Sequence, residues 1–477
     1  MANSQGKQMS QMPIAKLKYL VLLPLLALTQ VSYGQSTPDL RAIDSLQLTP
    51  EFWVARLERP DVLMSDTAAI DAQNEALFQR DSSMWNLRAI PATLHREQIE
   101  SWIVALADAP KRPLYDISGA QISQDELDTI VAGRNIGKIP PSQATRFGLV
   151  VRRANLRSFP TDLRVFRSIG NTDIDRFQET ALFPGTPVVI AHDSSDHEWW
   201  FVVSPRYAAW VRKEYIAEGN AETVLNYPDR RPFQIITGAT AHTVYTPEEP
   251  AVSELQLDMG VRVPVLDDWQ SDAPVNGQHR GRAYIIELPV RDGNGALRLQ
   301  PALLPGTSDS SSSPLPLTRA NIIQQGFKFL GERYGWGHSY NGRDCSGFVS
   351  EVYRSMGVLL PRNTSAQGVS PALQKRTFDE TASRAERMAA LESLDVGDLI
   401  YIPGHVMMVI GFVDGAPWVI HDTTGISFRA SDGKLLRMPL NAVSVTPFLP
   451  LHSSDTDTYV DIMTSIVRPA KGNSPDL

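Results

Sequence analysis

The spacing of apolar residues differs along the chain, and each pattern predicts a different kind of element. Residues 40–135 show a helical and polar pattern, which is clearest over residues 93–108. Apolar side chains of that segment share one helical face: Leu94, Ile99, Trp102, Ile103 and Leu106. The pattern predicts an N-terminal helical domain over residues 35–135, with no obvious chemistry in it.

Short alternating apolar runs, separated by turn residues, begin at Phe147 and predict strands. The first set covers residues 149–152, 187–191, 199–203 and 209–212. The second set starts near Phe233 and includes residues 261–266 and 283–289. Short strands at this spacing are typical of small barrels. We therefore expect two small β-domains in tandem, over residues 136–218 and 219–305.

The last third of the chain mixes helices and strands. Residues 306–317 are rich in serine and lack periodicity, which predicts a linker. Thr318 is placed to cap one helix, and a second helix is expected from Cys345 to Met356. Strands are expected at residues 399–402, 406–412 and 418–421. The pattern predicts an α+β domain over residues 318–450 and a C-terminal tail over residues 451–477. A length of 477 residues agrees with about three or four domains.

The N-terminus has the pattern of a secretory signal peptide over residues 1–34. Lysines precede an apolar run over residues 20–28, and Ser32-Tyr33-Gly34 supplies a small-residue cleavage site. The apolar run is too short to span a bilayer, for which about 18 to 20 residues are needed. We therefore expect export across the inner membrane, a periplasmic location, and no integral membrane segment after the signal is removed.

Composition and charge narrow the function. The chain is 42% hydrophobic and 21% charged, which suits ordinary globular cores. A formal net charge of -8 leaves no electrostatic basis for nucleic-acid binding. Cys345 is the only cysteine, although exported proteins that use cysteine for structure carry it in pairs. A lone thiol of this kind is either a buried small hydrophobe or a reactive nucleophile.

The position of Cys345 favours reactivity. The predicted helix starts at Cys345, where free backbone N–H groups and the helix dipole stabilise a thiolate. The same N–H groups could bind the oxyanion formed when the thiolate attacks a carbonyl. Asp344, directly before it, is either the N-cap of the helix or a substrate contact, and both interpretations remain open.

Two histidines could complete the chemistry. His405 precedes a predicted strand and His421 lies in the next one, with a turn at Asp414-Gly415 between them. A hairpin would bring both to nearby positions; the sequence does not specify the exact register, so they could share one face either directly or through a β-bulge. His405 would then be the base and His421 the group that orients it.

Other candidate groups are weaker. A metal site at His192, Asp193, Asp196 and His197 competes with a solvated turn, which that short loop favours. Thiol chemistry requires neither a metal nor a cofactor, and we expect neither.

These motifs resemble the NlpC family of papain-like bacterial cell-wall cysteine endopeptidases. The resemblance rests on residues 334–337 (YGWG), 344–349 (DCSGFV), 360–367 (LPRNTSAQ), 396–399 (VGDL) and 404–406 (GHV). The sequence departs from the family in Met407, where glycine is common, and in a longer spacing between the two histidines. The resemblance implies a papain-like catalytic domain with Cys345, His405 and His421 as its catalytic residues.

The upstream half is similar to the variant of this family with an N-terminal helical domain and two bacterial SH3-like barrels. The similarity rests on residues 157–161 (RSFPT), Trp199-Trp200 and Trp210. It implies that the first barrel restricts the cleft to short peptides with a free N-terminal L-alanine, as in released muropeptides. The cut would fall at the bond between γ-D-glutamate and a diamino acid. Asp344 and Ser346 would hold the amine end of the peptide, and Tyr334 would line the pocket.

Two alternatives stay open at this stage. The same catalytic residues would serve a papain-like amidase or acyltransferase that acts on another amide. A catalytically inactive protein that binds the cell wall through its barrels is the second alternative.

Overall fold

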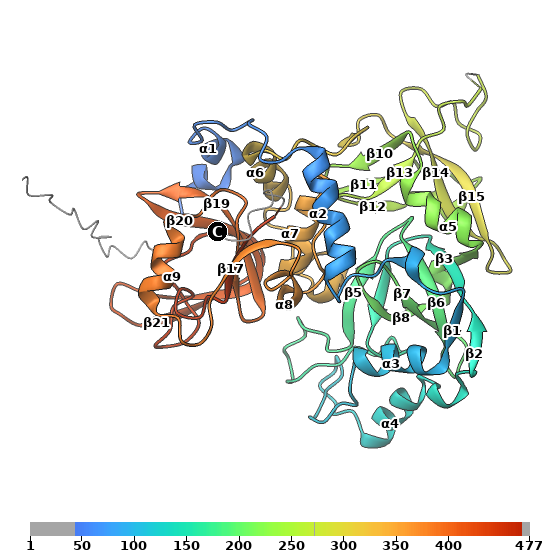
Figure 1. The fold of residues 1–477 in the computed structure, drawn as a ribbon, viewed down its shortest axis with the longest axis horizontal. Coiled ribbons are helices and arrows are strands. Elements are labelled where there is room, and N and C mark those ends of the chain that lie inside the picture. The colour runs from blue at the N-terminus through green and yellow to red at the C-terminus, as the bar shows by residue number, and fades with distance from the viewer. Residues whose placement is uncertain (1–42, 271, 470–477) are drawn as a thin grey trace, which may run out of the picture. The chain divides into compact units, whose positions relative to one another are not determined.

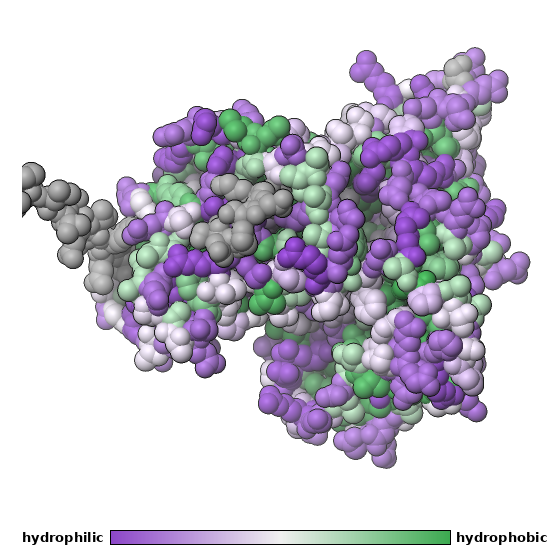
Figure 2. Space-filling model, viewed as in Figure 1, coloured by the Kyte–Doolittle hydropathy of each residue, from purple (hydrophilic) through white to green (hydrophobic). Residues whose placement is uncertain are grey.

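The computed structural model of the protein describes residues 43–270 and 272–469. The expected signal peptide and the last eight residues of the expected tail lie outside the described residues. In the described part of the chain, no helix is both long and apolar enough to cross a membrane. The face drawn in Figure 2 is mainly hydrophilic, with scattered apolar side chains of the kind that folded proteins usually expose.

The expected N-terminal helical region contains four α-helices and the strand β1 among its described residues, and β1 pairs with β2 just beyond residue 135. They are α1 (Pro50–Val54), α2 (Thr67–Arg80), β1 (Thr93–His95), α3 (Arg96–Leu106), α4 (Gln124–Ala132) and β2 (Ser142–Ala144). The amphipathic segment over residues 93–108 therefore begins as a strand, because Leu94 pairs with Gln143 of β2. The helix that follows buries Ile99 and Ile103, as the pattern predicted.

The helices of this region are divided between two cores. Trp53 of α1 and Leu77 of α2 are buried in one core with Trp418, and the ring centroids of Trp53 and Trp418 lie 5.6 Å apart. Ile103 of α3 packs instead in a second core with Trp210. Sequence periodicity identifies the apolar face of a helix, but the partner that covers this face comes from tertiary structure.

The first β-domain forms one sheet in the order β5-β4-β8-β7-β6-β3-β9. Its strands are β3 (Arg146–Val150), β4 (Ala154–Arg157), β5 (Gln178–Leu182), β6 (Pro187–Asp193), β7 (Trp199–Val203), β8 (Ala208–Arg212) and β9 (Ile216–Gly219). Every residue of β7 is buried, which explains its continuous apolar sequence. The connection from β4 to β5 is long, and it contributes to the site described below.

The second β-domain follows α5 (Ala221–Asn226) and consists of small sheets. Its strands are β10 (Phe233–Ile236), β11 (Thr240–His242), β12 (Gln256–Asp258), β13 (Arg262–Pro264), β14 (Tyr284–Arg291), β15 (Leu297–Leu304) and β16 (Ser310–Ser311). The segment expected to be a linker supplies β16, since Ser311 pairs with Ile235 of β10. The serine-rich stretch thus belongs partly to a sheet.

The C-terminal region packs helices against an antiparallel sheet (Figure 1). The strand order is β17-β23-β18-β19-β20-β21, and β22 pairs with β20. The strands are β17 (Gln374–Thr377), β18 (Leu399–Ile402), β19 (His405–Val413), β20 (Ala416–Arg429), β21 (Leu435–Pro447), β22 (Leu451–His452) and β23 (Ser465–Arg468). The helices are α6 (Arg319–Phe327), α7 (Cys345–Arg354), α8 (Thr364–Gln367) and α9 (Arg384–Leu391). β23 comes from the expected tail, so this sheet extends beyond residue 450.

The packing of α7 on β19 and β20 positions the nucleophile candidate. Asp344 caps this helix, because its Oδ1 accepts the N–H of Gly347 at 2.8 Å. Thr318 caps α6 in the same way through Asn321 at 3.1 Å, as the sequence predicted. The apolar face of α7 is buried in the C-terminal core, where Phe348 and Val352 have no exposed surface.

The hairpin of β19 and β20 contains the expected turn and also a bulge. Asp414 and Gly415 both have positive φ angles, of 51° and 77°. The register shifts between Val409 and Gly411, and Gly411 lies so close to Trp53 that an added Cβ would come within 2.8 Å of the indole ring. A side chain at this position would therefore disturb the contact between the hairpin and α1.

The bulge decides which face His405 shares. On the His405 side of the bulge, Met408 lies opposite Ile420, and one further step in this register leads to residue 407 and His421. Residue 405 is two positions from residue 407, so it shares the face of His421. Without the bulge the two imidazoles would point to opposite faces, since a one-residue slip inverts the side-chain pattern.

Candidate active site

Cys345 is the first residue of α7 and is 6% exposed. The backbone N–H of Val406 interacts with its thiol and favours the thiolate. Burial, reinforced by the charge of Asp344, outweighs this effect and raises the pKa of the Cys345 thiol to about 12. The position at a helix N-terminus led us to expect a lowered pKa. The pKa differs from this expectation mainly because the thiol is buried, and secondly because Asp344 adds a negative charge beside the sulfur.

His405, His421 and Thr446 form a hydrogen-bonded chain. Nε2 of His405 lies 2.8 Å from Nδ1 of His421, and Nε2 of His421 lies 3.1 Å from the hydroxyl of Thr446. His421 has no exposed surface. Burial lowers the pKa of His405 to about 4 and also lowers that of His421. Both imidazoles are therefore neutral near pH 7.

This chain decides which nitrogen of His405 can act as a base. Nε2 of His405 is occupied by His421, which leaves Nδ1 for a thiol proton. Base action at Nδ1 requires the tautomer with its hydrogen on Nε2, donated to His421. Thr446, which sequence reasoning did not identify, then accepts from His421 and fixes its tautomer.

The expected substrate-binding residues have different surroundings. Asp344 pairs with Arg362 at 2.8 Å, and Ser346 accepts a hydrogen bond from the same guanidinium at 2.8 Å. Arg362 overcomes the effect of burial and holds the pKa of Asp344 low, at about 2. Tyr334 is 7% exposed, and burial beside Cys345 raises its pKa. Asp344 and Ser346 line the cleft described next, whereas Tyr334 is buried beside it.

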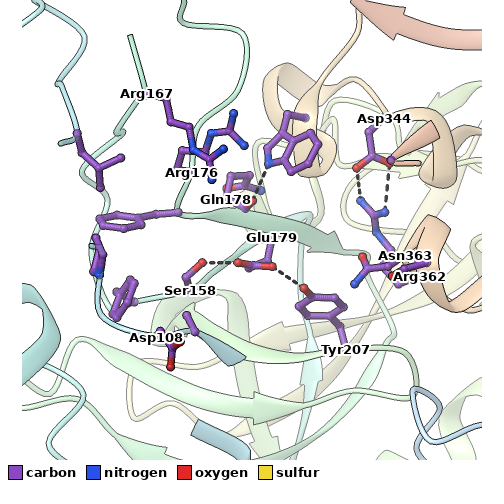
Figure 3. Close-up of a pocket in the computed structure, with 18 of the residues that line it drawn as sticks. Asp108, Ser158, Arg167, Arg176, Gln178, Glu179, Tyr207, Asp344, Arg362 and Asn363 are labelled. Atoms are coloured by element: carbon purple, nitrogen blue, oxygen red, sulfur yellow. Dashed lines mark hydrogen bonds and ion pairs between the residues drawn. The ribbon is translucent and has the colours of Figure 1, made fainter. Parts of the chain in front are cut away.

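A cleft of about 700 Å³ reaches Cys345 and is lined by three parts of the chain. The C-terminal region contributes residues around Cys345 and Arg362, and the first β-domain contributes its β4–β5 connection and Tyr207. The segment between α3 and α4 contributes residues 107–112. In Figure 3, Ser158, Glu179 and Tyr207 are joined by hydrogen bonds, and the pair of Asp344 and Arg362 lies beyond Tyr207.

Comparison with known protein families gives two matches that agree with this geometry. The SH3 domain (SH3b1 type) matches residues 164–212, and the NlpC/P60 family matches residues 331–444. The chain contains an NlpC/P60 domain. The matched residues include Cys345, His405 and His421, and the match confirms the family resemblance drawn from the sequence motifs.

Curated relatives match parts of the chain. A protein named gamma-D-glutamyl-L-lysine dipeptidyl-peptidase from Bacillus cereus is 31% identical over 193 residues, which are 38% of this chain and 47% of the relative. Dipeptidyl-peptidase 6 from Lysinibacillus sphaericus is 30% identical over 94 residues, which are 20% of this chain and 30% of the relative. The chain thus spans less than half the length of these relatives.

A solved structure shares the fold over most of the chain. It is described as a novel NlpC/P60 endopeptidase from Photobacterium damselae subsp. piscicida, with a TM-score of 0.70 and 17% identity. The similarity covers 88% of this chain and 96% of that one. The α+β architecture with an NlpC/P60 domain and an SH3 domain is therefore confirmed.

Buried charges connect the NlpC/P60 domain to both β-domains. Arg343, two residues before Cys345, has no exposed surface and pairs with Glu351 at 2.6 Å and Asp258 at 2.9 Å. Asp258 belongs to β12 and also pairs with Arg153 of the first β-domain. Arg153 in turn donates to the carbonyl of Gly342 at 2.6 Å. The loop that precedes Cys345 is therefore held from both sides.

Several residues of the site carried no usable signal in the sequence. Glu179, Tyr207 and Arg362 lie in the cleft, but Tyr207 and Glu179 are 28 residues apart and Arg362 is more than 150 residues from either. The motif containing Arg362 was recognised without a role for the arginine.

No group of three or more His, Cys, Asp or Glu residues within residues 43–270 and 272–469 could hold a metal ion.

Proposed function

We propose that the protein is a cysteine endopeptidase that cuts peptidoglycan stem peptides at the bond between γ-D-glutamate and a diamino acid. Its substrates would be released muropeptides with a free N-terminal L-alanine. The observation that carries the proposal is the position of the Cys345 thiol at the start of α7, in a cleft that Gly404 also lines. Gly404 directly precedes His405, which is hydrogen-bonded to His421 and through it to Thr446. Residue type and spacing match the acyl-transfer pattern of nucleophile, base and orienting group.

The geometry suggests how the reaction would proceed. As Sγ of Cys345 attacks the γ-carbonyl carbon, Nδ1 of His405 takes the thiol proton, so that the neutral resting pair becomes charged only during reaction. The N–H of Cys345 at the helix N-terminus would bind the oxyanion. The carbon–nitrogen bond then breaks and His405 protonates the leaving amine. Water, deprotonated by His405, releases the acyl group from sulfur.

The preference for a free amine has support in the charges of the cleft. The carboxylate of Asp344 is already neutralised by Arg362. Glu179 instead receives hydrogen bonds from the hydroxyls of Ser158 and Tyr207, and no cation pairs with it among the described residues. A substrate ammonium would give the Glu179 carboxylate a cationic partner, and a blocked amine would leave this carboxylate unpaired. We therefore assign the amine end to Glu179 in addition to Asp344 and Ser346.

Incubation with the tripeptide L-Ala-γ-D-Glu-diaminopimelate, followed by mass spectrometry, tests the proposal. The expected products are L-Ala-D-Glu and free diaminopimelate, with no products from the Cys345→Ala variant. The N-acetylated tripeptide should be cut far more slowly than the free one. A product in which the acyl group is joined to an added amine would identify an acyltransferase. Retention on insoluble wall without turnover of any peptide would identify a binding protein.

A further inference from the structure

The cleft around Cys345 is positively charged, although the whole chain is acidic. Five cationic side chains line it against three carboxylates, in a chain whose formal net charge is -8. The cations are Lys111, Arg112, Arg167, Arg176 and Arg362, and the carboxylates are Asp108, Glu179 and Asp344. A cleft of one sign within a chain of the opposite sign favours a ligand that carries the compensating charge.

Three arginines of the cleft, Arg112, Arg167 and Arg176, form no ion pair among the described residues, and of these Arg167 and Arg176 belong to the β4–β5 connection. Asp344 is occupied by Arg362, and Asp108 lies 3.9 Å from Lys111. Within the described ranges, neither Arg167 nor Arg176 forms an ion pair, and the buried Nε of Arg176 has no hydrogen-bond partner. Burial and the charge of Arg167 both lower the pKa of Arg176. A guanidinium that is partly desolvated, repelled and unpaired is a site for an anion.

The fold presents both arginines from one anchored connection. Each arginine is adjacent in sequence to a buried phenylalanine of the β4–β5 connection. Phe166 directly precedes Arg167, and Phe177 directly follows Arg176. The backbone N–H of Arg176 donates to Val165 at 2.8 Å. Figure 3 shows Arg167 and Arg176 reaching toward the same part of the cleft, above Gln178. The pair is therefore placed for two-point contact with a single carboxylate.

We propose that Arg167 and Arg176 form a specificity subsite that binds a free carboxylate of the substrate peptide. This proposal rests on the proposed peptidase function and adds the charge that the enzyme selects. A γ-linked stem peptide offers two sources of a carboxylate near the cut: the α-carboxylate of the D-glutamyl residue and the side-chain carboxylate of diaminopimelate. A lysine in place of diaminopimelate lacks the second, and amidation of the glutamyl residue removes the first.

Steady-state kinetics on three matched peptides separates these sources. The peptides are L-Ala-γ-D-Glu-diaminopimelate, its lysine analogue, and its analogue with an amidated D-glutamyl α-carboxylate, and in all three the C-terminal α-carboxylate is amidated so that it cannot occupy the subsite. We expect one analogue to lose about 10- to 100-fold in kcat/KM, the range typical of a hydrogen bond to a charged group. The analogue that loses activity identifies which carboxylate is bound. In the Arg167→Gln/Arg176→Gln variant the parent peptide should fall to the level of that analogue.

The control is Arg152→Gln, which removes one exposed cation of the same β-domain away from the cleft and should keep the full preference. Arg167 is exposed, so Arg167→Gln alone keeps the test valid if the double variant fails to fold. Equal rates on all three peptides, or an unchanged preference in a folded variant, would overturn the subsite. If no peptide is turned over, the proposed function fails. Calorimetry of the three peptides on Cys345→Ala then decides the subsite, and equal affinity or no binding overturns it.

Discussion

Replacement of Arg343 by methionine should destabilise the protein more than almost any other single change outside the apolar cores. The guanidinium has no exposed surface and lies 2.6 Å from Glu351, 2.7 Å from Glu332 and 2.9 Å from Asp258. Methionine fills much of the same volume but leaves the buried Glu351 without its nearest cation. Breaking a buried ion pair from one side typically costs about 3–5 kcal/mol, because the remaining charge stays desolvated.

The pH dependence of this loss has a defined sign. Burial would raise the pKa of Glu351, but Arg343 and a hydrogen bond from His338 hold it well below its usual range. A depressed carboxyl pKa contributes stability above the unfolded pKa of about 4.3, and this contribution is lost as pH falls through the folded pKa. The deficit of Arg343→Met should therefore be largest near pH 7. It should shrink as pH falls toward 4, where Glu351 in the variant can take up a proton.

Thermal unfolding measures the effect against a matched control. A loss of about 4 kcal/mol corresponds to a fall in Tm of roughly 8–16 °C for a cooperative unit of 150–250 residues. Arg333→Met makes the same chemical change at a side chain that is 61% exposed and pairs with Asp173 at 3.2 Å. The control should lose about 0–1 kcal/mol. Equal Tm values for the two variants, or a deficit in Arg343→Met that grows at low pH, would refute the reasoning.

Three further predictions concern the site. Cys345→Ala and His405→Ala should each abolish peptide turnover while circular dichroism stays unchanged. His421→Ala should lose less activity, because His421 orients the proposed base without being the base. An equal loss in His421→Ala would indicate that His421 is the base and His405 the orienting group. Burial raises the pKa of Cys345, so its alkylation by iodoacetamide should accelerate steadily from pH 6 to pH 10; a rate already at its plateau at pH 6 would indicate a resting thiolate–imidazolium pair. Asp422→Asn should raise Tm at pH 7, because both carboxylate oxygens of Asp422 are buried without partners and burial raises its pKa. Because the pKa of Asp422 is raised, the native protein is most stable below the unfolded pKa of about 3.9, where Asp422 is protonated. The gain in Tm of Asp422→Asn should therefore disappear as pH falls to that value, and a gain that stays constant with pH would contradict this prediction.

The parts of the site that depend on local sequence could be predicted. Asp344 and Cys345 begin a helix because a capping side chain precedes an apolar periodic segment, and both signals lie within a few residues. The hairpin could be inferred from Asp414-Gly415, whereas the bulge that puts His405 and His421 on one face is specified only by the register of the folded strands. Each of these inferences uses turn chemistry or side-chain period, which act over short stretches of chain.

The parts that depend on tertiary packing could not be predicted. Glu179 and Arg362 enter one cleft from different domains, and neither has a neighbour in sequence that indicates the other. Thr446 bonds His421 across two strands of the sheet, whose register no local pattern specifies. A lowered pKa of the Cys345 thiol was expected from its position at the helix N-terminus alone. Its actual direction depends on burial, which is a property of the folded chain.

The buried charge network joins the cleft wall of the first β-domain to the loop before Cys345 through a few shared residues. Arg153 extends from the first β-domain to the carbonyls of His338 and Gly342, and Arg343 follows directly in the chain. The other side of the same loop is fixed by His338, which lies 2.9 Å from Arg362 and 3.0 Å from Glu351. Movement of the first β-domain would therefore disturb the residues beside Cys345 as well as the cleft wall. A substrate that engages Arg167, Arg176 and Glu179 on that wall would bind the same β-domain that holds this loop, so that binding energy from groups beside the cut can help to align Cys345.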